Sequence, residues 1–236
     1  MIKAGIICAA DTELAPFLPH IEDVTVTERA MLRFYEGTIN GVAIVAVYSG
    51  VCKVNAAIAA QVLIDHYTVN AMVNAGTAGG IDQKVALFDT VISTQAVYHD
   101  VAKEILTEFH PWMESIYFQA DAKFLEIAKE IAHENHAVHL GCMATGEKFI
   151  EDHRREAIMQ TYAPLSVDME TASIAHVCYA NHIPFIAVRS ITDTAEHAGL
   201  EHFERNCKKA SHSAKDVVLT FLQKLNGDMD KNWRLQ

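Results

Sequence analysis

Short apolar runs alternate along the chain with stretches in which apolar residues recur at every third or fourth position. The short runs are typical of buried strands, and the three- and four-residue spacing is typical of an amphipathic helix. The pattern predicts strands at residues 2–9, 42–48, 71–74, 90–97, 138–142, 165–167 and 185–191. It predicts helices at residues 55–66, 122–135, 151–161, 171–181 and 201–225.

The order of these elements predicts an α/β fold. Strands that alternate with helices form a mostly parallel or mixed sheet covered by helices. Asn40-Gly41 lies between two apolar runs and is a hairpin signal, so at least one strand pair should be antiparallel. The chain has 236 residues and no Pro- or Gly-rich linker. We therefore expect one domain, residues 1–226, with a polar tail at residues 227–236.

The least regular segment is residues 102–120, which includes His110-Pro111-Trp112. A long segment without a helical or strand pattern is often a lid or an interface. Its aromatic part, residues 109–118, would be a liability if it were exposed on a monomer. The sequence therefore predicts a long loop and a homodimer.

Charge and hydropathy restrict the partners. The formal net charge is −11, from 19 basic and 30 acidic residues, which argues against a nucleic-acid surface because such a surface needs clustered cations. No apolar run approaches the ~20 residues of a membrane span. The apolar start is broken at Asp11 and Glu13, too early for a secretory signal. We expect a cytoplasmic protein without nucleic-acid or membrane partners.

The cysteines and histidines do not form a convincing metal or disulfide pattern. The five cysteines are odd in number and far apart, which favours reduced thiols; they are Cys8, Cys52, Cys142, Cys178 and Cys207. His133, His136 and His139 cross from a helix end into a strand, so their imidazoles need not converge. We predict no metal site. His99 is interpreted as a packing or hydrogen-bonding group.

Acidic residues follow three apolar runs. A carboxylate in an apolar wall costs several kcal/mol unless something binds it, so buried acids of this kind are candidates for function. Glu170 begins a helical pattern and Asp193 ends a strand, while Glu13 follows the first strand. Each has a structural alternative: a capping acid for Glu170, a turn former for Asp193 and a solvated acid in a first helical turn for Glu13.

The segment Asn74-Ala75-Gly76-Thr77-Ala78-Gly79-Gly80 follows a predicted strand. Its glycines allow backbone amides to approach a ligand closely. The glycine spacing differs from G-x-G-x-x-G and no P-loop Lys follows, so a nucleotide cofactor is not predicted. The alternative interpretation is a tight strand-to-helix turn without a ligand.

Four segments, in order, resemble the nucleoside phosphorylase and hydrolase family. They are the G-I-I-x-A-x-x-x-E start at residues 5–13, the glycine segment, residues 167–170, and the V-R-x-I-[ST]-D match at residues 188–193. The resemblance covers about residues 5–193 and is strongest to the branch that hydrolyses methylthioadenosine and S-adenosylhomocysteine. It implies a single-domain, nucleoside phosphorylase-like fold, an adenine nucleoside and water as reactants, and no cofactor.

The resemblance also implies roles for individual residues. Glu13 would activate water, Asp193 would protonate the leaving purine, and Glu170 would hold the ribose 2′ and 3′ hydroxyls. An acid on the leaving group and a base on water follow the logic of an inverting glycosidase. Phe149 would stack on adenine, with the backbone of Ile150 on its Watson–Crick edge. The other substrate-binding positions that the resemblance implies are Thr77, Gly79, Val167, Met169 and Thr192.

Three departures and two rival functions stay open. Asp168 stands where the family usually has Glu, Ala10 replaces a larger residue, and residues 101–120 do not follow the nucleosidase pattern, so the preferred 5′ substituent is not fixed. The rivals are a phosphate-dependent purine nucleoside phosphorylase and a non-catalytic nucleoside-binding protein.

Water is the expected nucleophile because a phosphorylase uses arginine to hold its phosphate. Asn74 stands where bacterial-type phosphorylases of this family carry an arginine. Arg29 and Arg33 are the remaining candidates, and both belong to the predicted hairpin region.

Overall fold

The computed structural model describes residues 2–150, 154–194, 196 and 199–229. The strands are β1 (Lys3–Cys8), β2 (Glu22–Arg29), β3 (Leu32–Ile39), β4 (Val42–Tyr48), β5 (Ala71–Gly80), β6 (Thr90–Tyr98), β7 (Tyr117–Gln119), β8 (Val138–Thr145), β9 (Ser166–Asp168) and β10 (Phe185–Asp193). The helices are α1 (Asp11–Leu14), the 3₁₀ turn η1 (Leu18–His20), α2 (Lys53–Asp65), α3 (Lys103–Thr107), α4 (Ala122–Glu134), α5 (Arg154–Tyr162), α6 (Thr171–Asn181) and α7 (Leu200–Met229).

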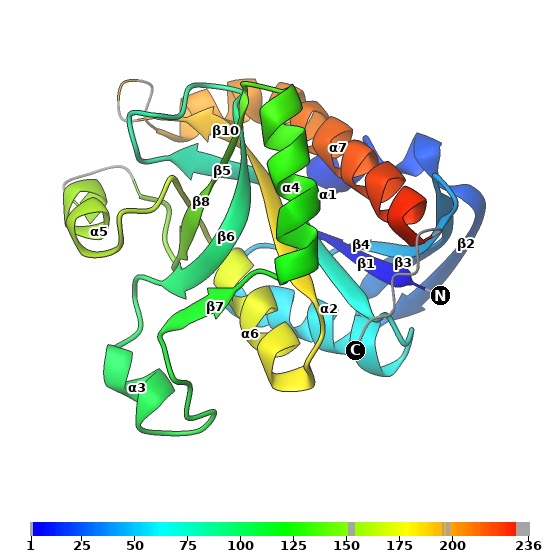
Figure 1. The fold of residues 1–236 in the computed structure, drawn as a ribbon, viewed down its shortest axis with the longest axis horizontal. Helices are drawn as coiled ribbons and strands as arrows, with labels where there is room; N and C mark the ends of the chain where they lie inside the picture. Colours follow the sequence, from blue (N-terminus) through cyan, green and yellow to red (C-terminus); the bar gives the residue numbers. More distant parts are fainter. Residues whose placement is uncertain (1, 151–153, 195, 197–198, 230–236) are drawn as a thin grey trace.

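The strands of the described chain form one sheet in the order β10-β6-β8-β9-β5-β1-β4-β3-β2, with β7 paired to β6 (Figure 1). β10 also pairs with β5, so β10, β6, β8, β9 and β5 close into a ring. β1 is parallel to β4 and β5, and β5 is parallel to β10, whereas β3 and β4 are antiparallel. The predicted mixed sheet is confirmed. The carboxyl ends of β1, β5 and β10 share one edge, where ligands of α/β sheets usually bind.

The predicted hairpin joins β3 to β4. Asn40 and Gly41 have φ angles of 51° and 77°, and Ile39 pairs with Val42. Two successive residues with positive φ are what a two-residue type I′ turn requires. The hairpin prediction is confirmed.

Helices cover both faces of the sheet. Successive strand residues point to opposite faces of the sheet. On one face, Ile6, Val73 and Val188 belong to the same buried cluster as Phe124 of α4 and Phe221 of α7. Figure 1 shows α4 and α7 lying across the near side of the strands. The opposite face packs on α2 and α6 through a second cluster that includes Ile7, Met72, Ala187, Leu63 and Ile174.

Helix α4 shows how the sequence sets an element. Asp121 precedes it and its carboxylate accepts the backbone N–H groups of Lys123 and Phe124, at 2.9 and 3.1 Å. Such a cap satisfies donors that have no partner inside the helix. Phe124, Ile127 and Ile131 then bury one face. None of the helices in the described chain is both long and apolar enough to cross a membrane.

The largest correction concerns residues 74–80, which are strand and not a turn. β5 runs to Gly80 and all its residues are buried. β10 pairs with this half of the strand, with Thr77 opposite Ser190, and β9 pairs with its last two residues, with Gly79 opposite Val167. Pairing with these strands outweighs the low strand propensity of glycine.

Other boundaries also differ. Residues 102–120 are not one uninterrupted loop: they contain α3 and β7, which pairs with β6. The last helix extends beyond the expected residue 225 to Met229. The remainder of the predicted tail, residues 230–236, and the expected helix start at residues 151–153 lie outside the described residues.

Candidate active site

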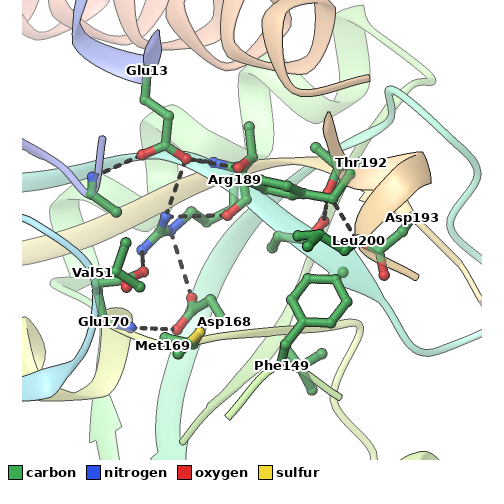
Figure 2. A pocket seen from close by; sticks show the side chains of 16 residues that line it. Glu13, Val51, Phe149, Asp168, Met169, Glu170, Arg189, Thr192, Asp193 and Leu200 are labelled. Atoms are coloured by element: carbon green, nitrogen blue, oxygen red, sulfur yellow. Dashed lines mark hydrogen bonds and ion pairs between the residues drawn. The ribbon is translucent and has the colours of Figure 1, made fainter. Parts of the chain in front are cut away.

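A cavity of about 260 Å³ opens at the edge where β1, β5, β9 and β10 end. Its lining residues are Ala9, Glu13, Val51, Thr77, Ala78, Gly79, Phe149, Val167, Asp168, Met169, Glu170, Arg189, Thr192, Asp193, Leu200 and Phe203 (Figure 2). All the predicted site residues are among them except Ile150. That residue lines a smaller adjoining hollow together with Gly79, Phe149 and Asp193.

Glu13 is buried at the start of α1 and its carboxylate is bound by four donors. One oxygen accepts the backbone N–H groups of Ala9 and Ala10, at 2.7 and 3.2 Å. The other accepts both the backbone N–H and the hydroxyl of Thr77, each at 2.7 Å. The solvated-acid interpretation is wrong, because Glu13 is 3% exposed. The donors hold its carboxylate in the cavity wall, as Figure 2 shows.

Gly76 makes room for this carboxylate. A Cβ at Gly76 would lie 2.6 Å from the carboxylate atoms of Glu13, and Gly76 has a φ of 154°. A side chain is excluded there by both contact distance and backbone conformation. The sequence suggested that this glycine allows a ligand to approach the backbone. In the structure it leaves space for the carboxylate of Glu13, a catalytic candidate of the chain itself.

Asp168 caps helix α6. One of its oxygens accepts the backbone N–H groups of Glu170 and Thr171, at 3.1 and 3.0 Å, and the hydroxyl of Thr145 at 2.7 Å. Its second oxygen accepts the hydroxyl of Thr171. Asp168 therefore binds the backbone N–H groups at the start of α6, and the side chain of Glu170 makes no capping hydrogen bond. The interpretation of Glu170 as the capping acid is wrong.

Glu170 instead lies in the cavity wall. Its carboxylate accepts the backbone N–H of Cys52 at 2.9 Å and Nη2 of Arg189 at 3.0 Å. Burial raises the pKa of Glu170 from 4.5 to about 7, with Arg189 opposing the rise and Asp168 adding to it. This carboxyl group therefore changes its protonation near neutral pH.

Arg189 is a residue to which sequence reasoning gave no role. It is completely buried in β10 and donates to Asn74 at 3.1 Å, to the carbonyl of Thr77 at 3.1 Å and to Glu170. The carboxylates of Glu13 and Asp168 lie 3.9 and 3.6 Å from its guanidinium. Burial lowers the pKa of Arg189, but the three acids together raise it above its ordinary value. The sequence did contain a signal for this residue. An arginine inside an apolar strand is a buried cation, and a buried cation needs anions nearby.

Asp193 ends β10 on the other side of the cavity (Figure 2). Its Oδ1 accepts the hydroxyl of Thr192 at 2.9 Å and its Oδ2 accepts Nη2 of Arg155 at 2.8 Å. Phe149 lies beside it, and the Phe149 ring meets Phe203 of α7 edge-on, at 6.1 Å between centroids. Asp193 is thus a buried, paired acid next to an aromatic face.

The other candidates lie away from this cavity. Arg29 and Arg33 are exposed on the β2–β3 hairpin, and Arg33 pairs with Glu28. His139 lies on β8 and contacts Asp89 at 2.8 Å. His99 packs against Gly146, and its Nε2 atom is buried without a hydrogen-bond partner in the described chain.

Comparison with known proteins gives the family. The model of the phosphorylase superfamily matches residues 3–223. The chain belongs to this superfamily. A 5′-methylthioadenosine/S-adenosylhomocysteine nucleosidase of Exiguobacterium sp. is 33% identical over 234 residues, which cover 95% of this chain and 99% of that protein.

Solved structures of the superfamily are also similar to this one. The nucleosidase of the same name from S. pneumoniae, solved with a transition-state inhibitor, is 30% identical with a TM-score of 0.87, over 95% of this chain and all of that chain. The futalosine hydrolase of Helicobacter pylori is 25% identical with a TM-score of 0.85, over 94% of this chain and 98% of that chain. The family therefore includes hydrolases with different named substrates.

Proposed function

We propose that this protein hydrolyses the N-glycosidic bond of 5′-thio-substituted adenine nucleosides, 5′-methylthioadenosine and S-adenosylhomocysteine, and releases adenine. The observation that carries the proposal is the arrangement of the buried acids Glu13, Glu170 and Asp193 around one cavity, with Glu13 and Asp193 on different sides. Hydrolysis of a glycosidic bond with inversion needs a base for water on one face of the sugar and an acid on the leaving group. The similarity to nucleosidases supports the same reaction.

The base end of the site suits a purine. Adenine is a poor leaving group as an anion, and protonation at N7 by Asp193 makes it neutral as the bond breaks. Phe149 offers a ring face for stacking, and the backbone of Ile150 offers a donor and an acceptor for the Watson–Crick edge. These groups bind an adenine ring without any cofactor.

The opposite end suits the sugar and water. An ionised Glu170 accepts hydrogen bonds from the adjacent 2′ and 3′ hydroxyls and stabilises positive charge that develops on the sugar. Glu13 takes the proton from water, and Arg189 lies close enough to both carboxylates to stabilise them. Met169 and Val167 line the wall next to Glu170.

Apolar side chains favour a thioether at the 5′ position. Val51, Leu200 and Phe203 line the cavity along with Met169. A 5′ phosphate would have to be buried against these groups, which is costly without a paired cation. We therefore assign 5′-thio nucleosides, and not nucleotides, as the substrates.

Base release from a panel of nucleosides tests the proposed function. Purified protein is incubated with methylthioadenosine, S-adenosylhomocysteine, adenosine, inosine and futalosine, and free base and sugar are quantified. We expect release of adenine from the first two at the highest kcat/KM. The Asp193→Asn variant is the control for contaminating activity. Failure to release any base would favour the non-catalytic nucleoside-binding alternative, and preference for futalosine would reassign the substrate.

Water is the proposed nucleophile. Arg189 is the one arginine that lines the cavity within the described residues, and its guanidinium is already bound to Glu170, Asn74 and Thr77. A phosphate dianion would also face the carboxylate of Glu13. Adenine release is therefore expected to be the same in phosphate-free buffer and in excess phosphate. Strict phosphate dependence, or ribose-1-phosphate products, would place the protein among the phosphorylases.

We also propose a homodimer. Val54 and Ile58 are exposed one helical turn apart on α2, and Phe109 and Trp112 near α3 are 63% and 66% exposed. Exposed pairs of large apolar side chains such as these are typical of an interface. Light scattering at micromolar concentration should give twice the 26.1 kDa of one chain. A monomer at that concentration would contradict this assembly.

The proposed location is the cytoplasm. All five cysteines are free, and four of them are buried. Free thiols persist in a reducing compartment.

A further inference from the structure

Arg155 connects three separate segments at the base end of the cavity. It lies on α5 and is buried. Its Nε donates to the carbonyl of Ile150 at 3.1 Å, Nη1 to the carbonyl of Gly80 at 2.6 Å, and Nη2 to Oδ2 of Asp193 at 2.8 Å. One guanidinium thus contacts the end of β5, the end of β10 and the segment that carries Phe149 and Ile150.

The contact with Asp193 fixes the orientation of its carboxyl group. Thr192 donates to one oxygen and Arg155 to the other, so the carboxyl plane is held from two sides. Gly79 lies against the same group, since a Cβ there would be 3.0 Å from Oδ2 of Asp193. A misplacement of about 1 Å can cost a catalytic group about 100-fold in rate.

The contact with Ile150 is made by its backbone carbonyl, which the proposed function places at the Watson–Crick edge of the purine. A carbonyl oxygen has two lone pairs, so the Ile150 carbonyl can accept Nε of Arg155 and still accept a second donor. In the proposed function that donor is the 6-amino group of adenine. The same side chain therefore holds the group that recognises the base and the group that protonates it.

We propose that Arg155 is a positioning residue that aligns Asp193 and the Ile150 carbonyl on one purine ring, so that recognition of adenine and its protonation are coupled. This inference rests on the proposed function, because it assigns a purine to the base end. A planar guanidinium is needed for it: lysine carries the charge but cannot direct three donors along fixed directions.

The geometry also separates Arg155 from Arg189. Arg189 contacts Glu170 and approaches Glu13 at the sugar end, whereas Arg155 contacts Asp193 at the base end. Loss of Arg155 should therefore affect departure of the base and leave the binding of the sugar and water largely unchanged.

The test compares substrates whose leaving groups differ in their need for a proton. The variants are Arg155→Met, which removes the donors, and Arg155→Lys, which keeps the charge. Gln160→Met is the matched control, because it introduces the same side chain at an exposed position on the same helix. The substrates are methylthioadenosine and the 4-nitrophenyl riboside with the same 5′-methylthio group, whose phenolate leaves without protonation.

For methylthioadenosine we expect Arg155→Met to lower kcat by about 10- to 100-fold, a part of what general acid catalysis is worth. Arg155→Lys should recover part of the loss, and Gln160→Met should match the wild type. For the nitrophenyl riboside, Arg155→Met should change kcat/KM by less than about threefold, because no proton is transferred to the leaving group.

Equal losses on both substrates in a folded Arg155→Met protein would overturn the proposal, since they would indicate general damage to the site. Wild-type rates on methylthioadenosine would overturn it as well. Circular dichroism and thermal unfolding establish that each variant is folded. If the wild type itself releases no adenine from methylthioadenosine, the proposed function fails; if the wild type is active and Arg155→Met is equally active, only the role of Arg155 fails.

Discussion

The two ends of the cavity are built in different ways. At the sugar end, Arg189 lies inside β10, and Glu13 and Glu170 lie at the starts of the helices that follow β1 and β9. Backbone donors of β5 and of the segments that begin α1 and α2 bind the carboxylates of Glu13 and Glu170. At the base end, Asp193 ends a strand, but Phe149, Ile150 and Arg155 lie outside the sheet. The sugar end is therefore set by sheet pairing, and the base end depends on side-chain contacts across separate segments.

The two buried arginines show the consequence of this difference. Arg189 pairs in register with Gly76 of β5 and Val91 of β6, so strand pairing fixes the position of its backbone. Arg155 reaches the sheet only through its side chain. We expect mutations at the sugar end to lower both stability and activity, and mutations at the base end to lower activity more than stability.

The largest expected effect is that of Asp193→Asn on base release. The amide keeps the shape of the carboxyl group but cannot give a proton to a leaving purine, so kcat should fall by about 10²- to 10⁴-fold. The rate is measured by chromatography of free adenine, and thermal unfolding should show a folded protein. Retention of more than about half of the wild-type rate would remove Asp193 from its proposed role.

Arg189→Met tests the sugar end through stability. Removing this cation leaves the carboxylates of Glu13, Asp168 and Glu170 buried without their common partner. Breaking a buried ion pair in this way typically costs about 3–5 kcal/mol of unfolding free energy. Urea denaturation measures it, with Arg33→Met on the exposed hairpin as the control. If Arg155→Met destabilised the protein as much as Arg189→Met, the comparison between the two ends would be wrong.

The sequence predicted more of the fold than of the contacts within the site. Apolar periodicity predicted the main strands and helices, because each buries one stripe or face. It did not predict that residues 75–80 form a strand, because pairing with β9 and β10 decides that and involves residues about 90 to 110 positions away. Short motifs brought Glu13, Glu170 and Asp193 to attention. The bonds of Arg189 and Arg155 depend on tertiary contacts that no local pattern encodes.

Gly76→Ala should have a smaller effect at the sugar end. The new methyl group would lie 2.6 Å from the Glu13 carboxylate, so that carboxylate or the strand must move. Overpacking of this kind costs about 1–3 kcal/mol, and displacement of Glu13 should lower kcat as well. Gly227→Ala on α7 is the matched control, because a Cβ there meets nothing within 4 Å. Equal stability and activity of the two variants would show that Glu13 does not need this space.

Glu170 should also give the stability of the protein a pH dependence. Its pKa is raised from 4.5 to about 7 in the folded protein, so between these values the folded state holds a proton that the unfolded state has released. The unfolding free energy should therefore fall as pH rises from about 4.5 through about 7, and the Glu170→Gln variant should lack this part of the decline. Urea denaturation at several pH values measures it.

Ligand binding should reveal the same group at the sugar end. Hydroxyl donors favour the ionised carboxylate, so binding of a nucleoside analogue near pH 7 should release a fraction of a proton, and the release should vanish well above pH 8. Calorimetry in two buffers of different ionisation enthalpy counts these protons. Glu170→Gln should abolish the proton release, raise KM and lower kcat. Proton release that persists in the variant would assign the titration to another group and leave the ribose contact of Glu170 unsupported.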